Sequence, residues 1–302
     1  MSQLTKALSG FARPSQILCD EPMARHTTFR VGGPADVFFM PESDAQVIKA
    51  LAAARDAGVN AYIIGNGSNL IVRDGGIRGL VIALGDGMAK ITREGDTIEA
   101  QAGASLAKVA AFAQGEGLSG LEFASGIPGT LGGGCAMNAG AYGGQLSDVL
   151  IDARVLMEGE VKTLSRDALR MGYRTSLPLQ TGGVVLSARF ALRPDDPETI
   201  AARMRELNAR RRDKQPLNFP SAGSTFKRPE GHFAGALIEQ SGMKGRAVGG
   251  ARVSEKHAGF IVNTGGATAA DILDLIDVVR GEVRSRFGVT LETEVRVLGE
   301  NR

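Results

Sequence analysis

Two stretches of small residues have the composition of loops that hold phosphate or a flat polar ligand. The first, residues 65–69 (GNGSN), lies between two short apolar runs. Small residues let successive backbone N–H groups converge on an anion, and the Ser and Asn side chains add donors. It is not a dinucleotide-binding fingerprint, because Leu70 stands at the third glycine position and no helical pattern follows. A tight turn between two strands is an equally good explanation.

The second stretch, from Ser125 to Gly144, carries almost no bulky side chains. A run of this length would lose much conformational entropy on folding if it only connected two elements. Asn138 and Tyr142 stand among its small residues, which a simple connection does not need. We therefore expect a flat, polar ligand to lie against it, and a flexible loop or lid is the alternative.

Helical and strand patterns are interspersed along the chain, which indicates an α+β fold without internal repeats. Ser43 with Gln46 forms a capping box, and Thr268 precedes an apolar helical pattern that Gly288 closes. The expected helices are 43–58, 105–114, 197–212 and 268–287. The expected strands are 61–64, 80–84, 97–102, 149–157, 184–192 and 291–298.

Composition excludes several classes of protein. The 302 residues carry a net charge of +2, which is too small for a nucleic-acid footprint over the whole chain. Cys19 and Cys135 form neither a CxxC pair nor a disulfide framework, as is typical of a reducing compartment. We find no secretory signal and no apolar stretch long enough to span a membrane, so we expect a cytoplasmic protein.

Four further segments carry a resemblance to a known family. They are residues 27–35 (TTFRVGGPA), 173–176 (YRTS), 221–227 (SAGSTFK) and 291–296 (LETEVR). Together with the two glycine-rich stretches, they resemble the UDP-N-acetylenolpyruvoylglucosamine reductase family over nearly the whole chain. The resemblance implies a vanillyl-alcohol-oxidase-type FAD-binding domain of two α/β subdomains, followed by a smaller α/β substrate-binding domain. We expect an N-terminal segment at 1–27, the FAD domain at 28–195 and the substrate domain at 196–302, with the C-terminal strand returning to the active site.

The same resemblance implies a set of cofactor-binding residues. The FAD pyrophosphate is expected on the loop from Asn66 to Asn69, and the isoalloxazine ring near Gly126 to Thr130. His26 and Cys135 are interpreted as structural, because this family binds its flavin noncovalently. The full expected set is Asn66, Gly67, Ser68, Asn69, Ser125, Gly126, Ile127, Pro128, Gly129, Thr130, Gly133, Gly134, Asn138, Ala139 and Gly140.

By resemblance, the activity is the reduction of UDP-N-acetylglucosamine enolpyruvate to UDP-N-acetylmuramate in peptidoglycan precursor synthesis, with NADPH as hydride donor. The family pattern makes Ser224 the proton donor and places Arg174 and Glu294 beside the enolpyruvyl group. Hydride addition to this group builds negative charge on its carboxylate, which a fixed arginine stabilises. A hydroxyl can then protonate the adjacent carbon if nearby charges stabilise the alkoxide. A carboxylate such as Glu294 suits an anionic substrate only if it is protonated or orients a donor.

Further residues are candidates for contacting the rest of the substrate. Lys214 is expected near the diphosphate, where a point charge is suitable, and Tyr142 and Lys227 are further candidates. Ser224 follows Arg174 by only 50 positions, so the chain resembles the class without the inserted loop whose tyrosine covers the nucleotide.

We expect a monomer that binds neither nucleic acid nor membrane. The rival hypotheses are an FAD oxidase of the same fold acting on another alcohol or sugar, and a phosphate or nucleic-acid binding protein using 65–69 and 210–212.

Overall fold

The computed structural model describes residues 2–301 and divides the chain into two compact units made of interleaved segments. Unit 1 comprises Met1–Leu18, Phe38–Asn66 and Val81–Arg211, and unit 2 comprises Cys19–Val37, Gly67–Leu80 and Arg212–Arg302. The sequence predicts a linear division near residue 195, but the chain passes between the units several times. The assignment of cofactor and substrate binding to separate domains stays a prediction.

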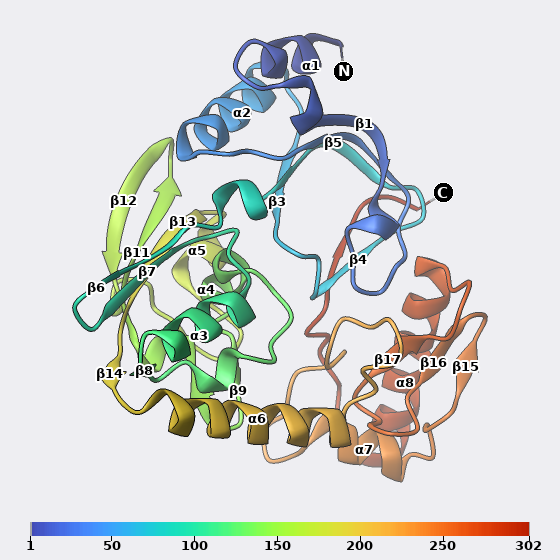
Figure 1. Cartoon of the computed structure of the whole chain (residues 1–302). Coiled ribbons are helices and arrows are strands. Elements are labelled where there is room, and N and C mark those ends of the chain that lie inside the picture. Colours follow the sequence, from blue (N-terminus) through green and yellow to red (C-terminus); the bar gives the residue numbers. More distant parts are fainter. Residues whose placement is uncertain (1, 302) are drawn as a thin grey trace. The chain divides into compact units, whose positions relative to one another are not determined.

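Unit 1 is built on a five-stranded antiparallel sheet with strand order β12-β11-β13-β7-β6 (Figure 1). Apolar side chains of this sheet, of α3 and of α4 form one buried core. A short helix, α5, contacts β11 and α4. The bounds are β6 (Ile91–Glu94), β7 (Thr97–Gln101), α3 (Leu106–Gly115), α4 (Leu131–Ala136), β11 (Leu150–Met157), β12 (Glu160–Ser165), α5 (Leu177–Thr181) and β13 (Val184–Ala191).

A four-stranded sheet near the N-terminus has the order β1-β2-β5-β3. The division between the units falls within β1, β2 and β5. In unit 1, α1 packs on α2, which begins at the expected cap: Ser43 Oγ accepts the N–H of Gln46. The bounds are α1 (Ser2–Ser9), β1 (Ile17–Pro22), β2 (Pro34–Phe39), α2 (Asp44–Asp56), β3 (Ala61–Ile64) and β5 (Ile77–Ala83).

Unit 2 is organised around α8, whose apolar face is buried in a second core with Phe29 and Ile71. Strand β4 pairs in parallel with β18, and β15, β16 and β17 form a three-stranded sheet. This pairing brings two segments from distant parts of the sequence together. The bounds are β4 (Leu70–Val72), α7 (Ala234–Gln240), β15 (Ala247–Val248), β16 (Ala251–Val253), β17 (Ile261–Asn263), α8 (Ala269–Phe287) and β18 (Arg296–Leu298).

Helix α8 is capped at both of its ends. Thr268 Oγ1 accepts the N–H of Asp271, and the Asp271 carboxylate accepts the N–H of Thr268. The Asp74 carboxylate accepts the N–H groups of Ala269 and Ala270, at 3.0 and 2.9 Å. Gly288 ends the helix in the left-handed conformation, with φ of 70°. The predicted start and end of this helix are confirmed.

Two regions differ from the sequence-based expectation. Only Arg296–Leu298 of the expected strand 291–298 is a regular strand, because residues 292–294 contact an irregular segment at 225–227 instead. Residues 115–145, where no helix or strand is predicted, contain α4 and three short strands. These strands are β8 (Leu118–Ser119), β9 (Gly140–Ala141) and β10 (Gly144–Gln145).

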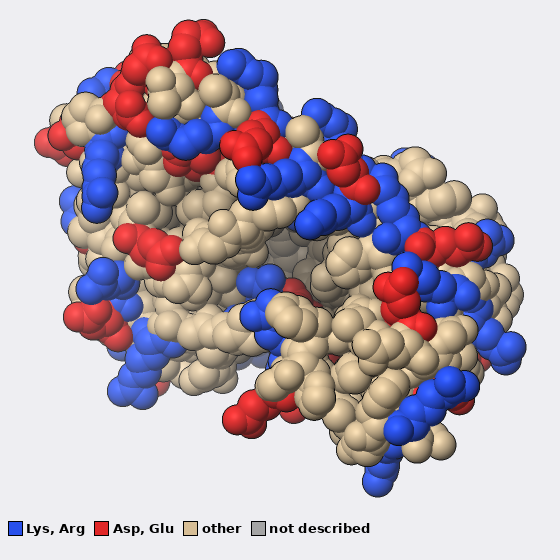
Figure 2. Space-filling model, turned by 90° about the horizontal axis from the view of Figure 1, so that it is seen from below, with Lys and Arg blue, Asp and Glu red and all other residues tan. Residues whose placement is uncertain are grey.

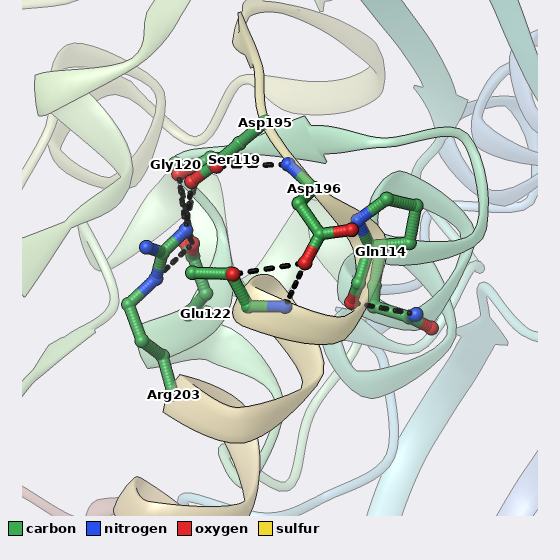
Figure 3. Close-up of polar contacts among 9 residues, drawn as sticks. Gln114, Ser119, Gly120, Glu122, Asp195, Asp196 and Arg203 are labelled. Carbon is green, nitrogen blue, oxygen red and sulfur yellow. Dashed lines mark hydrogen bonds and ion pairs between the residues drawn. The ribbon is translucent and has the colours of Figure 1, made fainter.

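A polar network connects α6 (Pro197–Lys214) to the chain before the second glycine-rich stretch. Arg203 forms ion pairs with Glu122 and Asp195 and donates to Ser119 Oγ (Figure 3). Nearby, β14 (Arg193–Pro194) pairs with β8. Burial alone would raise the pKa of Glu122, but hydrogen bonds from backbone N–H groups, Ser119 and Arg203 outweigh it and hold this pKa below its ordinary value.

The depressed pKa of Glu122 predicts a pH-dependent contribution to stability. The folded state favours the ionised carboxyl, so its contribution is present above the unfolded-state pKa and is lost as pH falls through the folded-state pKa. Glu122→Gln should lower the free energy of unfolding by about 1–2 kcal/mol at pH 7, and the difference should shrink below the ordinary pKa of 4.5. Urea unfolding between pH 3 and 7 measures this. Glu160→Gln, at an exposed strand position, is the control, and an equal loss at all pH values would contradict the assignment.

Candidate active site

Two segments that are distant in the sequence, 224–227 and 292–294, meet within unit 2, and the loop at Asn69 joins them. Phe226 and Thr293 form an antiparallel bridge, and the N–H of Glu294 donates to the carbonyl of Thr225 at 2.8 Å. The N–H of Lys227 donates to the carbonyl of Glu292 at 2.9 Å. The structure therefore places Ser224 and Glu294 on neighbouring segments, as their predicted roles require.

Thr225 fixes the backbone next to Ser224. Its side chain is fully buried, and its Oγ1 accepts the N–H of Ile261 at 3.1 Å. Its own N–H donates to the carbonyl of Gly259 at 2.8 Å. Ser224 is partly exposed, and its hydroxyl forms no hydrogen bond to any residue in the described part of the chain. A fixed backbone with an uncommitted hydroxyl is the arrangement that a proton donor needs.

The first glycine-rich loop is connected to the Glu294 segment. Asn69 Nδ2 donates to the carbonyl of Glu294 at 3.0 Å, and the N–H of Arg296 donates to the carbonyl of Asn69 at 3.0 Å. The loop then continues into β4, which pairs with β18. Asn69 therefore supports the predicted catalytic segment through its side chain, a role that the composition of the loop did not reveal.

The preceding residues of this loop are suited to an anion. Within residues 2–301, the N–H groups of Gly67 and Ser68 and the Ser68 hydroxyl form no hydrogen bond to protein. Gly67 has a φ of 59°, and a Cβ there would collide with the carbonyl of His26. Successive N–H groups next to a left-handed residue form an anion-binding concavity. These donors suit the pyrophosphate of FAD.

The segment from Gly126 to Thr130, predicted to lie near the isoalloxazine ring, is in unit 1 and is hydrogen-bonded to residues 104–106. The N–H of Leu106 donates to the carbonyl of Gly129, and the N–H of Leu131 donates to the carbonyl of Ala104, at 2.9 and 2.8 Å. Among the described residues, the N–H groups of Gly126, Gly129 and Thr130 have no protein acceptor. The unused donors of this segment suit the polar edge of a flavin.

Residues of the second stretch serve different purposes. Gly133 is exposed on α4, with no atom closer than 3.6 Å to a Cβ placed there. Gly134 is buried, and a Cβ on it would lie 3.0 Å from Leu106 and 3.2 Å from Leu146. Packing therefore explains Gly134 without a ligand. Ile127, Pro128, Ala139 and Gly140 are each at least partly exposed in unit 1.

The side chain of Asn138 is used inside the protein. It is almost fully buried, and its Nδ2 donates to Gln145 Oε1 and to the carbonyl of Gly172, at 3.2 and 3.3 Å. Its Oδ1 accepts the N–H of Ser147 at 3.1 Å. These bonds connect the second stretch to the turn that carries Arg174. The structure gives the Asn138 side chain a positioning role, and cofactor binding at this residue stays a prediction.

Arg174 lies at the tip of a tight turn in unit 1. Gly172 and Thr175 exchange backbone hydrogen bonds of 3.0 and 3.3 Å, and Arg174 has a φ of 56°. Left-handed backbone is uncommon for a residue other than glycine and occurs at functional sites. The Ser176 hydroxyl donates to the carbonyl of Ala136 at 2.7 Å, which holds the far side of the turn. The guanidinium lies over the ring of Tyr173.

Two of the substrate-side candidates, Tyr142 and Lys214, are exposed, and Lys227 is partly exposed. Tyr142, in unit 1, has a φ of 54° and an exposed side chain. In unit 2, Lys214 is exposed, and Lys227 pairs with Glu292 at 3.0 Å. On the face drawn in Figure 2, basic and acidic side chains are interspersed. A single-sign surface therefore does not guide an anion to that face, and local cations would have to bind it.

One cysteine and two histidines, Cys135, His257 and His26, have structural surroundings. Burial raises the pKa of the Cys135 thiol to about 12, so it stays protonated at neutral pH. Burial lowers the pKa of His257, whose ring packs edge-on against Phe260. His26 is paired with Glu21 at 2.9 Å. Among residues 2–301, no group of three or more His, Cys, Asp and Glu side chains could hold a metal ion.

None of the helices described here is long and apolar enough to cross a membrane.

The positioning role of Asn138 predicts a loss of stability when its side chain is removed. Asn138→Ala would leave the Gly172 carbonyl and the Ser147 N–H without their partner, which costs about 1–3 kcal/mol when such groups are buried. Urea unfolding of the protein without added cofactor measures this. Gln180→Ala, which removes an exposed hydrogen bond to Thr175, is the control. Equal stability of the two variants would contradict the assignment.

Comparisons with known proteins agree with this architecture. Residues 35–165 match the FAD binding domain family, and residues 215–298 match the C-terminal domain of UDP-N-acetylenolpyruvoylglucosamine reductase. The reductase of Alkaliphilus oremlandii is 50% identical over 296 residues, covering 98% of this chain and 97% of that protein. That of Agathobacter rectalis is 53% identical over 297 residues, covering 94% of each.

Solved structures give the same result. The reductase from Thermus caldophilus superimposes with a TM-score of 0.80 and 35% identity, covering 93% of this chain and 97% of that one. An alkyldihydroxyacetonephosphate synthase matches 64% of this chain and 41% of its own with a TM-score of 0.50 and 19% identity, a likeness of fold alone. On the family matches and on identity that spans nearly its whole length, this chain belongs to the UDP-N-acetylenolpyruvoylglucosamine reductase family.

Proposed function

We propose that the chain reduces UDP-N-acetylglucosamine enolpyruvate to UDP-N-acetylmuramate with NADPH, as an FAD-dependent step of peptidoglycan precursor synthesis in the cytoplasm. The observation that carries this proposal is the meeting of the Ser224, Glu294 and Asn69 segments within unit 2. Noncovalently bound FAD would supply hydride transfer from NADPH to the enolpyruvyl carbon. The membership of the chain in the reductase family supports the same reaction. We further propose that it acts as a monomer.

The chain's own residues would bind the cofactor through backbone donors. The N–H groups of Gly67 and Ser68 are assigned to the pyrophosphate, and those of Gly126, Gly129 and Thr130 to the flavin edge. Cys135 is buried and protonated, which supports noncovalent binding. The match of residues 35–165 to an FAD binding domain supports cofactor binding in this part of the chain.

The proposed chemistry needs one cation and one proton donor. Negative charge develops on the substrate carboxylate as hydride adds, and Arg174 is assigned to stabilise it. The turn that holds Arg174 is fixed by Ser176 and Asn138, so little reorganisation would be needed. The Ser224 hydroxyl is assigned to protonate the adjacent carbon, and Glu294 to orient groups beside it. Lys214, Lys227 and Tyr142 are assigned to the rest of the substrate.

Gly67→Ala tests the assignment of the first loop. A Cβ at this position collides with the His26 carbonyl and opposes the left-handed backbone, which would displace the two N–H donors. FAD affinity, measured by titrating flavin fluorescence, should fall at least about tenfold, the equivalent of one charge-assisted hydrogen bond. Gly58→Ala is the matched control, because Gly58 has a φ of 65° with nothing within 4 Å of a Cβ. An equal affinity in the two variants would remove the loop from the FAD site.

Ser224→Ala tests the proton donor. Without the hydroxyl, the second half of the reaction loses its acid, while hydride transfer from NADPH does not use it. Anaerobic bleaching of the flavin by NADPH should be unchanged, and recovery of the yellow colour on addition of the enolpyruvyl sugar should slow at least about 100-fold. Ser221→Ala, three residues earlier, is the control. Normal recovery in Ser224→Ala would exclude this residue from proton transfer.

A further inference from the structure

An exposed phenylalanine in unit 2 has no packing role that explains it. Phe233 is 61% exposed, although the apolar residues that follow it on α7, Ala234, Leu237 and Ile238, are buried. A large aromatic side chain left in water forgoes the favourable free energy of burial. A ligand that covers the ring would recover that free energy.

The backbone holds this ring in a fixed place. Phe233 is the N-cap of α7, and its carbonyl accepts the N–H of Leu237 at 3.1 Å. Just before it, the N–H of His232 donates to the carbonyl of Pro229 at 3.1 Å and closes a turn. Gly231 supplies the positive φ, 69°, that such a turn requires. The exposed ring therefore projects from rigid backbone, as a binding platform should.

The residue just before this turn, Arg228, places a cation against the ring. The Arg228 guanidinium carbon lies 4.2 Å from the centroid of the Phe233 ring. An arginine stacked on an aromatic face fixes the ring and adds positive charge beside it. Because Phe233 is still largely exposed, ring surface remains for a second flat group.

The platform lies on the segment that carries the predicted proton donor. Arg228 follows Ser224 by four residues, and the chain between them is in bridge contact with Thr293. Four extended residues span at most about 13 Å. The proposed substrate is long, with a hexose, a diphosphate and a ribose between its reacting group and its uracil. A base platform must therefore lie away from Ser224 but on the same surface.

We propose that Phe233 stacks on the uracil ring of the substrate, with Arg228 behind it as a positioning residue whose charge favours the adjoining diphosphate. The inference rests on the proposed function and assigns its nucleotide end. It also answers a question that the sequence leaves open, because the chain has no room for the inserted tyrosine loop of the longer class. Stacking on an aromatic ring needs only a flat base, so hydrogen bonds elsewhere would select uracil.

Phe233→Leu tests the platform because leucine keeps apolar bulk and removes the ring. KM for the enolpyruvyl sugar should rise about tenfold, within the range found for loss of one stacking side chain, with kcat changed less than about twofold. Phe233→Tyr keeps the ring and should restore KM. Phe287→Leu, at another exposed phenylalanine of unit 2, is the matched control and should behave as the unaltered protein. Urea unfolding confirms that all variants are folded.

Binding and half-reaction measurements separate the possible outcomes. By calorimetry, Phe233→Leu should bind UDP about tenfold more weakly and inorganic pyrophosphate equally well. An unchanged KM and an unchanged UDP affinity would overturn the proposal. Slower bleaching of the flavin by NADPH, with normal use of the sugar, would also overturn it, because it would assign the ring to NADPH binding. If the sugar fails to reoxidise the flavin of the unaltered protein, the proposed function itself fails. If it succeeds and Phe233→Leu is normal, only the uracil assignment fails.

Discussion

The hydrogen bonds of Thr225 are the constraint on which the unit 2 part of the site depends. Its N–H and hydroxyl are bonded to Gly259 and Ile261 on one segment, and its carbonyl is bonded to Glu294 on another. Since buried polar groups must be satisfied, moving Thr225 would leave several of them without partners at once. Ser224 is covalently next to this anchor and inherits its fixed position, while its own hydroxyl stays uncommitted. Thr225 thus holds the backbone in place, and the adjacent Ser224 keeps a hydroxyl that is available for chemistry.

The loop around Gly67 likewise combines residues that are bonded within the protein with residues whose donors are not used by it. Asn69 uses both its side chain and its carbonyl to hold the Glu294 segment. Gly67 and Ser68 keep their N–H groups free of protein acceptors. A displacement of this loop would therefore also displace Glu294. The loop proposed to bind phosphate and the segment proposed to act in catalysis are thus held together by these two bonds.

In unit 1, two residues of the second glycine-rich stretch and the predicted charge-stabilising arginine share an unusual backbone conformation. Asn138, Tyr142 and Arg174 all have positive φ, a conformation that is costly for residues with a side chain. The surrounding structure offsets this cost with the hydrogen bonds of Asn138 and Ser176 and with the packing of α4 against the sheet. Such strain persists only where the fold holds it firmly, and here the bond from Asn138 to the Gly172 carbonyl connects the stretch to the turn of the predicted charge-stabilising arginine.

The sequence by itself determined the capped helices, most of the strands and the family, because these depend on local capping, periodicity and motif content. Ser43, Thr268 and Gly288 perform the local roles that their types predict. Only the tertiary structure decided that Asn138 and Gly134 serve packing and support, and that residues 292–294 pair with 225–227 instead of extending a strand. It also decided the interleaved units and the exposed ring of Phe233. These features arise from contacts between residues far apart in the chain, and a pattern of neighbouring residues carries no information about such contacts.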